Sequence, residues 1–281
     1  MRNVGIQTIL SAFGGGLFGA AIGALPAFIF TGFIGLIGIA VLASGGSPTI
    51  LNDVTFGSLF GPHIAFAGGV AAAAFAANKK KYLENGTDIL TSLNKFGDST
   101  VLIVGGLFGI LGYLLNNLFV SMNLKLDTPG LTVFILGVLA RLLFGKTGIF
   151  GEKKDSSGEK KKILLDGKTL FFNIVLGFGL GFVISYLVIL TQINVLGFCI
   201  SAALLIFAQM GFEIPTTHHI SMVAGYAAIA SGNIWIATAF AVLASIVAEI
   251  AGRIFNTNCD SHIDPPATTI FVCSAIIFAL F

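Results

Sequence analysis

Charged residues are scarce in this chain of 281 residues. They make up 10% of the sequence, whereas a soluble domain carries about 25%. Hydrophobic residues account for 56%, and the mean hydropathy is +0.96. This number of charged residues is too small to cover a water-exposed surface. We therefore expect the chain to lie in a lipid bilayer. The net charge of +2 is too small, and too unevenly placed, to indicate a nucleic-acid partner.

Cysteine is rare as well. The chain has three, at Cys199, Cys259 and Cys273, with no CxxC spacing between them. An odd number of scattered cysteines predicts neither a disulfide framework nor a zinc site. The sequence also lacks a Walker A motif, a Rossmann glycine motif after a strand, and HExxH. We therefore expect no cofactor and do not expect an enzyme.

Long apolar runs fill most of the chain. A membrane-crossing helix needs about 20 apolar residues. The third, fifth, eighth and tenth predicted helices are short for a full crossing. We predict an all-α integral membrane protein with about ten transmembrane helices, some of them short or broken. The predicted ranges are 4–25, 26–45, 63–78, 99–121, 130–145, 169–190, 194–211, 219–232, 234–255 and 267–281.

Two pairs of similar segments indicate an internal duplication. Residues 63–74 and 219–230 both begin with His-Ile and continue with matching Gly and Ala. Residues 127–134 and 264–271 share Asp, Pro, Thr and Phe at equivalent positions. Because the two motifs follow in the same order, we predict a true repeat. Its halves are residues 1–145 and 169–281, joined by a cytoplasmic linker at 146–168.

The number of helices per repeat has a topological consequence. An odd number forces the second copy to insert upside down, which gives a 5+5 inverted-topology repeat. With the N-terminus outside, every Lys and Arg except Arg2 and Lys125 falls in or beside cytoplasmic loops at 79–98, 146–168 and 256–266. This distribution follows the positive-inside rule. We predict a multi-pass protein of the cell membrane with its N-terminus outside.

The inverted arrangement resembles that of urea transporters and ammonium channels. The resemblance is one of architecture, and the signature motifs of neither family occur in this sequence. It therefore implies no functional residues here. More generally, an inverted repeat in a membrane protein favours a transporter or channel with its site between the two copies.

The repeated histidines are the first candidates for such a site. His63 follows Gly-Pro and His219 follows Pro-Thr-Thr-His, so both are expected at the start of a short helix. The helix dipole disfavours a charged imidazole there. A neutral histidine can exchange hydrogen bonds with a small solute or relay a proton. The alternative role is a cap or a bond to neighbouring backbone.

The repeated aspartates are the second candidates. Asp127 and Asp264 precede prolines and are expected to cap helices. Capping does not exclude lining a pathway, because inverted-repeat transporters bind solutes at the ends of broken helices. Thr132 and Thr269, five residues further on, can add hydroxyl groups or bond to their own helix.

Two further polar groups lie outside the repeat pattern. Glu249 lies in an apolar helix with Arg253 four residues on, so it forms an ion pair or carries a coupling proton. The cluster around Cys259 and His262 has metal-ligating residue types. Its counterpart in the first half keeps only the aspartate, so we predict no metal site.

These patterns together favour a secondary transporter or permease that moves a small solute through a site between the repeats. Coupling to protons or to a cation is left open, and a homo-oligomer in the bilayer is expected. The alternatives are a passive oligomeric channel, a membrane-embedded metal-dependent enzyme, and the membrane subunit of a larger complex. The candidate pathway residues are His63, His219, Asp127, Asp264, Thr132, Thr269 and Glu249.

Overall fold

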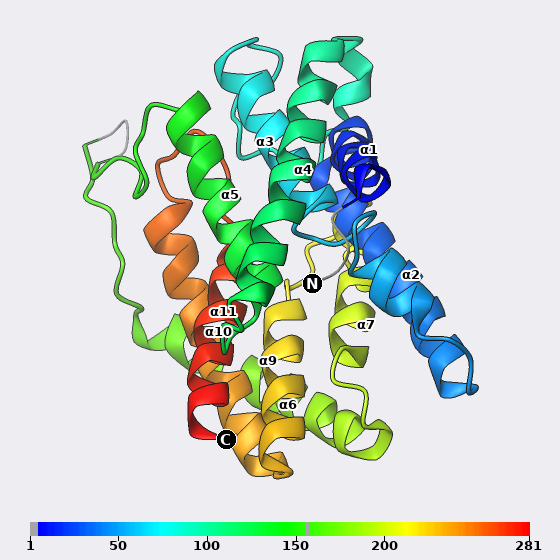
Figure 1. The fold of residues 1–281 in the computed structure, drawn as a ribbon. Helices are drawn as coiled ribbons and strands as arrows, with labels where there is room; N and C mark the ends of the chain where they lie inside the picture. Colours follow the sequence, from blue (N-terminus) through cyan, green and yellow to red (C-terminus); the bar gives the residue numbers. More distant parts are fainter. Residues whose placement is uncertain (1–4, 155–157) are drawn as a thin grey trace.

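The computed structural model describes residues 5–154 and 158–281, and this part of the chain is all helical (Figure 1). The predicted all-α class is confirmed. Arg2, which we placed outside the membrane, lies beyond the described residues. The helices are α1 (Ile6–Ile22), α2 (Ala24–Ala43), α3 (Ala65–Asn78), α4 (Ser99–Ser121), α5 (Thr128–Phe144), α6 (Gly167–Thr191), α7 (Leu196–Leu204), α8 (Ile206–Gln209), α9 (His218–Ser231), α10 (Ile234–Phe255) and α11 (Pro265–Leu280), with a π-helical turn at Ile50–Thr55 and a 3-10 turn at Leu93–Phe96.

Four helices, α2, α4, α6 and α10, are long and apolar enough to cross a membrane. Their length and composition indicate a membrane protein. Helices α1, α3, α5 and α11, and the α7–α8 segment, are apolar but shorter. Crossing by these shorter helices, and the side of the membrane on which each loop lies, stay predictions.

Several helices begin earlier than the apolar pattern predicts, because polar side chains cap them. The Asp127 carboxylate accepts a hydrogen bond from the Gly130 amide, so α5 begins at Thr128. Asp264 caps α11 in the same way, with Pro in the first turn. The helix predicted over 194–211 is broken at Leu205, where the chain forms a tight turn between α7 and α8.

Glycines allow the helices of each half to approach closely. Helix α1 packs against α3 and α4, and α6 packs against α9 and α10. A Cβ atom at Gly19 of α1 would lie 1.8 Å from the Ala65 carbonyl oxygen of α3. A Cβ atom at Gly177 of α6 would lie 2.7 Å from the Val242 Cα of α10. Close packing of small residues is how helices associate in lipid.

The two halves of the chain meet through α2 with α7 and through α5 with α11. In Figure 1, α3 and α5 occupy the upper part of the molecule, and α9 and α11 run downward from its middle. The Asp127 amide donates to the Ser274 hydroxyl at 2.7 Å. The rings of Phe134 and Phe271 lie 5.4 Å apart. The N-terminal parts of α5 and α11 therefore lie side by side, and the two helices run in opposite directions.

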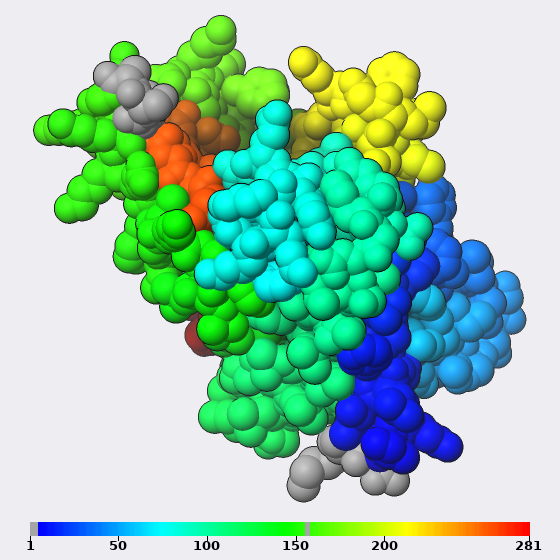
Figure 2. Space-filling model, turned by 90° about the horizontal axis from the view of Figure 1, so that it is seen from above, coloured from blue at the N-terminus to red at the C-terminus, as the bar shows by residue number. Residues whose placement is uncertain are grey.

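The three loops predicted to be cytoplasmic gather on one face of the molecule. Figure 2 shows this face, with residues 79–98 in cyan, the linker in green and the loop after α10 in orange. The Asn85 amide donates to the Cys259 carbonyl at 3.1 Å. The Glu152 backbone amide donates to the Asn258 carbonyl at 2.8 Å. The loops thus share one face, as loops on one side of a membrane must.

Candidate functional site

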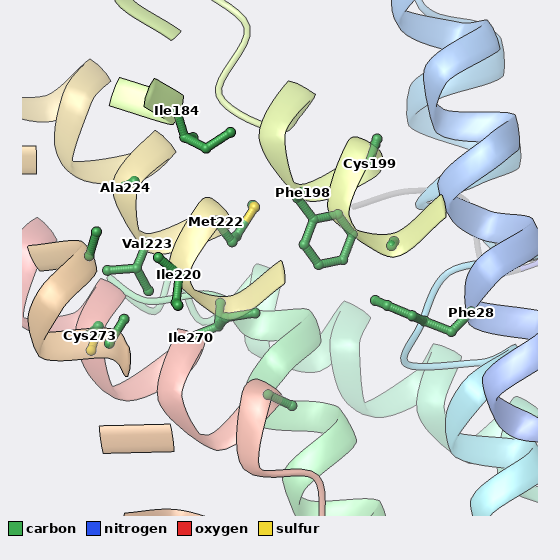
Figure 3. Close-up of a cluster of buried hydrophobic side chains, with 14 of the residues drawn as sticks. Phe28, Ile184, Phe198, Cys199, Ile220, Met222, Val223, Ala224, Ile270 and Cys273 are labelled. Carbon is green, nitrogen blue, oxygen red and sulfur yellow. The ribbon is translucent and has the colours of Figure 1, made fainter. Parts of the chain in front are cut away.

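A cavity of about 830 Å³ lies where the two halves meet. Its wall includes the first turns of three helices, at Asp127–Gly130 of α5, His218–Ile220 of α9 and Asp264–Ala267 of α11. Aromatic side chains form much of the remaining wall. Phe28 from α2 and Phe198 from α7 have ring centroids 5.6 Å apart in an edge-to-face arrangement, and Figure 3 shows the Phe198 ring between Phe28 and Met222.

The start of α5 contributes a carboxylate that joins the two halves. Asp127 is buried, and its Oδ1 accepts from the Gly130 amide at 2.5 Å. Its Oδ2 accepts a hydrogen bond from the Tyr226 hydroxyl, two turns into α9. The side chain therefore caps α5 and also holds α9 of the other half against it.

The start of α11 contributes the second carboxylate, with a different partner. Asp264 Oδ2 accepts from the Ala267 amide at 2.7 Å. Asp264 Oδ1 lies 3.1 Å from His262 Nε2. The other ring nitrogen of His262 lies 3.4 Å from the Asn256 side-chain amide. A hydrogen-bonded series thus runs from the loop after α10 to the cavity.

Among the three helix starts in the cavity wall, the start of α9 has buried polar atoms without hydrogen-bond partners in the described part of the chain. Thr217 at the N-cap position makes no side-chain cap, because its hydroxyl bonds to that of Ser201. His218 and His219 are only 7% and 6% exposed. Their Nδ1 atoms have no hydrogen-bond partner within the described residues. A buried polar atom without a partner costs about 1–3 kcal/mol, so these two rings are candidate contacts for a bound solute.

The residues predicted from the sequence divide into two groups. His219, Asp127, Asp264 and Glu249 line the cavity. The Glu249 carboxylate also accepts from Arg253 Nε at 2.9 Å, which is the ion pair expected from their spacing. This pair occupies the wall formed by α10.

The other predicted residues are buried away from the lining described for this cavity. The Thr132 hydroxyl donates to the Thr128 carbonyl at 2.8 Å. Thr269 bonds to its own helix in the same way. His63 is 2% exposed, and its carbonyl oxygen lies so close to Gly112 of α4 that a Cβ there would be 1.8 Å away. Of the two repeated histidines, the structure brings His219 to the cavity.

Among the lining residues that were not sequence candidates, His218, His262 and Tyr226 carry the groups most relevant to the site. Two of them carried a usable signal. His218 directly precedes a candidate histidine, and Tyr226 lies seven residues after His219, which places both on one face of a helix. His262 was set aside because it has no counterpart in the first half, and its contact with Asp264 depends on how the loop folds.

The metal-ligating residue types near the end of α10 do not converge. The Asp260 carboxylate accepts from the Thr147 hydroxyl at 2.9 Å, and the Cys259 thiol donates to the Ser261 carbonyl at 3.3 Å. Burial raises the pKa of the Cys259 thiol, which favours its protonated form. Among the residues that the structure describes, no three His, Cys, Asp or Glu side chains lie close enough to hold a metal ion.

A buried arginine fixes the segment that leads to His262 and Asp264. Arg141 of α5 is 1% exposed. Its guanidinium donates to the carbonyls of Ile149 and Phe255 at 2.8 and 2.6 Å. It also donates to the Ser261 hydroxyl at 3.0 Å and to the Ser261 carbonyl, and to the Asn256 side chain at 3.3 Å. One side chain therefore sets the course of the backbone over residues 255–261.

The fold and the cavity define an all-helical membrane protein that encloses an aromatic-walled site with carboxylates and histidines from several helices. The chain belongs to a family of unknown function, DUF7973, whose sequence profile matches residues 1–159 and 172–281. Neither a curated protein nor a solved structure matches the chain.

Proposed function

We propose that this protein is a membrane transporter that moves a small solute through the cavity between its two halves. The observation that carries the proposal is the position of the cavity at the first turns of α5, α9 and α11. Short helices that begin at a central site, in both halves of the chain, are typical of inverted-repeat transporters.

We also propose that the halves form the predicted 5+5 inverted repeat. The paired packing of α1 with α3 and α4, and of α6 with α9 and α10, supports it. Asp127 and Asp264 cap their helices in the same way. The opposite directions of α5 and α11 at their contact fit a two-fold axis in the membrane plane.

A coupled transporter fits this site better than a passive channel. The cavity wall contains buried carboxylates and histidines, which are the groups that take up and release protons inside membranes. Several polar contacts join the two halves. Asp127 bonds to Tyr226 and Ser274, and Arg141 bonds to the loop after α10, so a movement of one half against the other would have to break or carry along these contacts.

Uptake by reconstituted protein tests the proposal. The purified protein is screened for a rise in Tm with amines, carboxylic acids, amino acids, nucleobases and sugars. The best stabilising compound is then offered, radiolabelled, to proteoliposomes. We expect uptake that falls at least about tenfold in Asp264→Asn, as is usual when a buried charge in a binding site is removed.

The matched control is Glu213→Gln, which makes the same kind of change at an exposed position before α9. It should transport like the wild type. A stabilising compound that never enters the vesicles, or equal uptake by wild type and Asp264→Asn, would count against the proposal. Uptake that ignores an imposed pH difference would favour a passive channel over a coupled transporter.

A further inference from the structure

We propose that the cavity selects a small organic cation, a protonated amine carried on an apolar and preferably aromatic body. This inference rests on the proposed function only in taking the cavity as the solute site. Four properties of the wall point to this class of molecule: its charge, its unused hydrogen-bonding atoms, its aromatic rings and its size.

The charge of the cavity wall is negative. Asp127, Asp264 and Glu249 line it, and no Lys or Arg is among the lining residues in the described part of the chain. Arg253 neutralises Glu249 from outside the lining. A carboxylate keeps room for further donors after its first two hydrogen bonds, so Asp264 can still accept from a cation. A negatively charged solute would meet charges of its own sign.

The unpartnered atoms at α9 suit the same ligand. His218 Nδ1 and His219 Nδ1 are buried in the cavity wall with no hydrogen-bond partner within the described residues. A neutral imidazole nitrogen accepts a hydrogen bond when the other ring nitrogen carries the proton. An ammonium group brings three donors and no acceptor. Its donors can therefore be shared between a carboxylate and these rings, once a rotation of the side chain turns a ring nitrogen into the cavity.

The uncapped start of α9 opposes a cation only weakly. A helix N-terminus acts as roughly half a positive elementary charge. The corresponding ends of α5 and α11 already carry the Asp127 and Asp264 carboxylates. Each carboxylate offsets the half positive charge of the helix end that it caps, which leaves about half a negative charge at each of those two ends. Together these exceed the half positive charge of the uncapped α9 end, so the electrostatic preference of the site remains for a cation.

The aromatic wall explains why the cation should be organic. Phe28, Phe66 and Phe198 line the cavity, and the Phe28 ring lies 4.6 Å from the His218 ring. Aromatic faces attract a cation placed within about 6 Å and also bury an apolar body. The volume of about 830 Å³ is far larger than an inorganic ion needs, and it falls within the roughly 300–1,000 Å³ of sites for organic ligands.

Binding of three matched probes to the purified protein tests the inference. The probes are 2-phenylethylamine, 2-phenylethanol and 3-phenylpropionate, which share a phenyl body and differ in charge at neutral pH. We expect the amine to bind at least about tenfold more tightly than the alcohol, and the carboxylate to bind more weakly than either. Calorimetric titration in detergent gives the three dissociation constants.

Two variants locate the binding. Asp264→Asn should weaken the amine at least about tenfold and leave the alcohol unchanged. Asparagine caps helices as well as aspartate does, so α11 is retained. Phe28→Leu removes one aromatic face and should weaken the amine more than the alcohol. Glu213→Gln is the control, and all three variants are checked for a wild-type Tm without ligand.

The outcomes separate this inference from the proposed function. Tighter binding of the carboxylate than of the amine, no binding of any probe, or an unchanged amine affinity in Asp264→Asn would overturn the inference. None of these results would affect a transport activity found with another solute. Tight amine binding without any uptake into proteoliposomes would support the inference and overturn the transport proposal.

Discussion

Replacement of Arg141 by lysine tests whether one buried side chain holds the loop that carries half of the site. The guanidinium makes five hydrogen bonds, to Ile149, Phe255, Asn256 and twice to Ser261. Lysine keeps the positive charge. It offers three donors, all on one nitrogen, so at least two of the five hydrogen bonds must be lost.

The expected magnitude follows from these lost bonds. A hydrogen bond from a charged donor contributes about 1.5–3 kcal/mol, so the loss of two costs at least about 3 kcal/mol. For a chain of this size, 1 kcal/mol shifts Tm by about 2–4 °C. Arg141→Lys should therefore lower Tm by roughly 6–12 °C.

The assay is thermal unfolding of the detergent-purified protein, with hydrogen exchange of the loop as a local readout. Exchange should rise over residues 255–262, because Arg141 bonds directly to this segment. The control is Arg253→Lys, since Arg253 forms a partly exposed ion pair, and such pairs contribute about 0–1 kcal/mol. Equal Tm values for the two variants, or unchanged exchange of the loop, would refute the reasoning.

Two further predictions concern packing and acid stability. Gly19→Ala should destabilise the protein by about 1–3 kcal/mol, because the new Cβ would lie 1.8 Å from a backbone oxygen of α3. The control is Gly14→Ala. A Cβ at Gly14 meets nothing within 4 Å, so this variant should leave Tm unchanged or slightly higher. Hydrogen bonds from Thr100 and Lys80 hold the pKa of the Asp98 carboxyl well below its usual range. The stability from this group is complete above the unfolded pKa of about 3.9 and is lost as the pH falls toward the lower folded value. Tm measured across acidic pH should therefore fall less steeply in Asp98→Asn than in the wild type.

The helix starts could be read from the sequence because their signals are local. Asp127 and Asp264 each stand before proline, and the structure places both at N-caps. The break at Leu205 had no such signal, since it lies within a run of Ala, Leu and Ile. Contacts with α2 and α9, far away in the sequence, accompany that break. A break of this kind depends on tertiary packing, which the local pattern does not encode.

The candidate site shows how far a repeat can guide the choice of residues. The repeat proposed His63 and His219 together, yet only His219 lines the cavity among the residues described. Duplicated backbones can keep equivalent helices while their side chains face different neighbours. The repeat also led us to set aside His262, which has no counterpart but contacts Asp264 at 3.1 Å. Residues unique to one half therefore need separate consideration.

The two repeated carboxylates differ in their hydrogen-bond partners, and this difference decides how each is connected to the surface of the protein. Asp127 accepts from the hydroxyl of Tyr226, and a tyrosine keeps its proton at neutral pH. Asp264 contacts the His262 ring instead. The His262 ring also contacts Asn256, in the loop on the face where the lysine-rich segments gather. In the proposed transport cycle, Asp264 would therefore be the carboxylate that polar side chains connect to that face, while Asp127 holds the helices together.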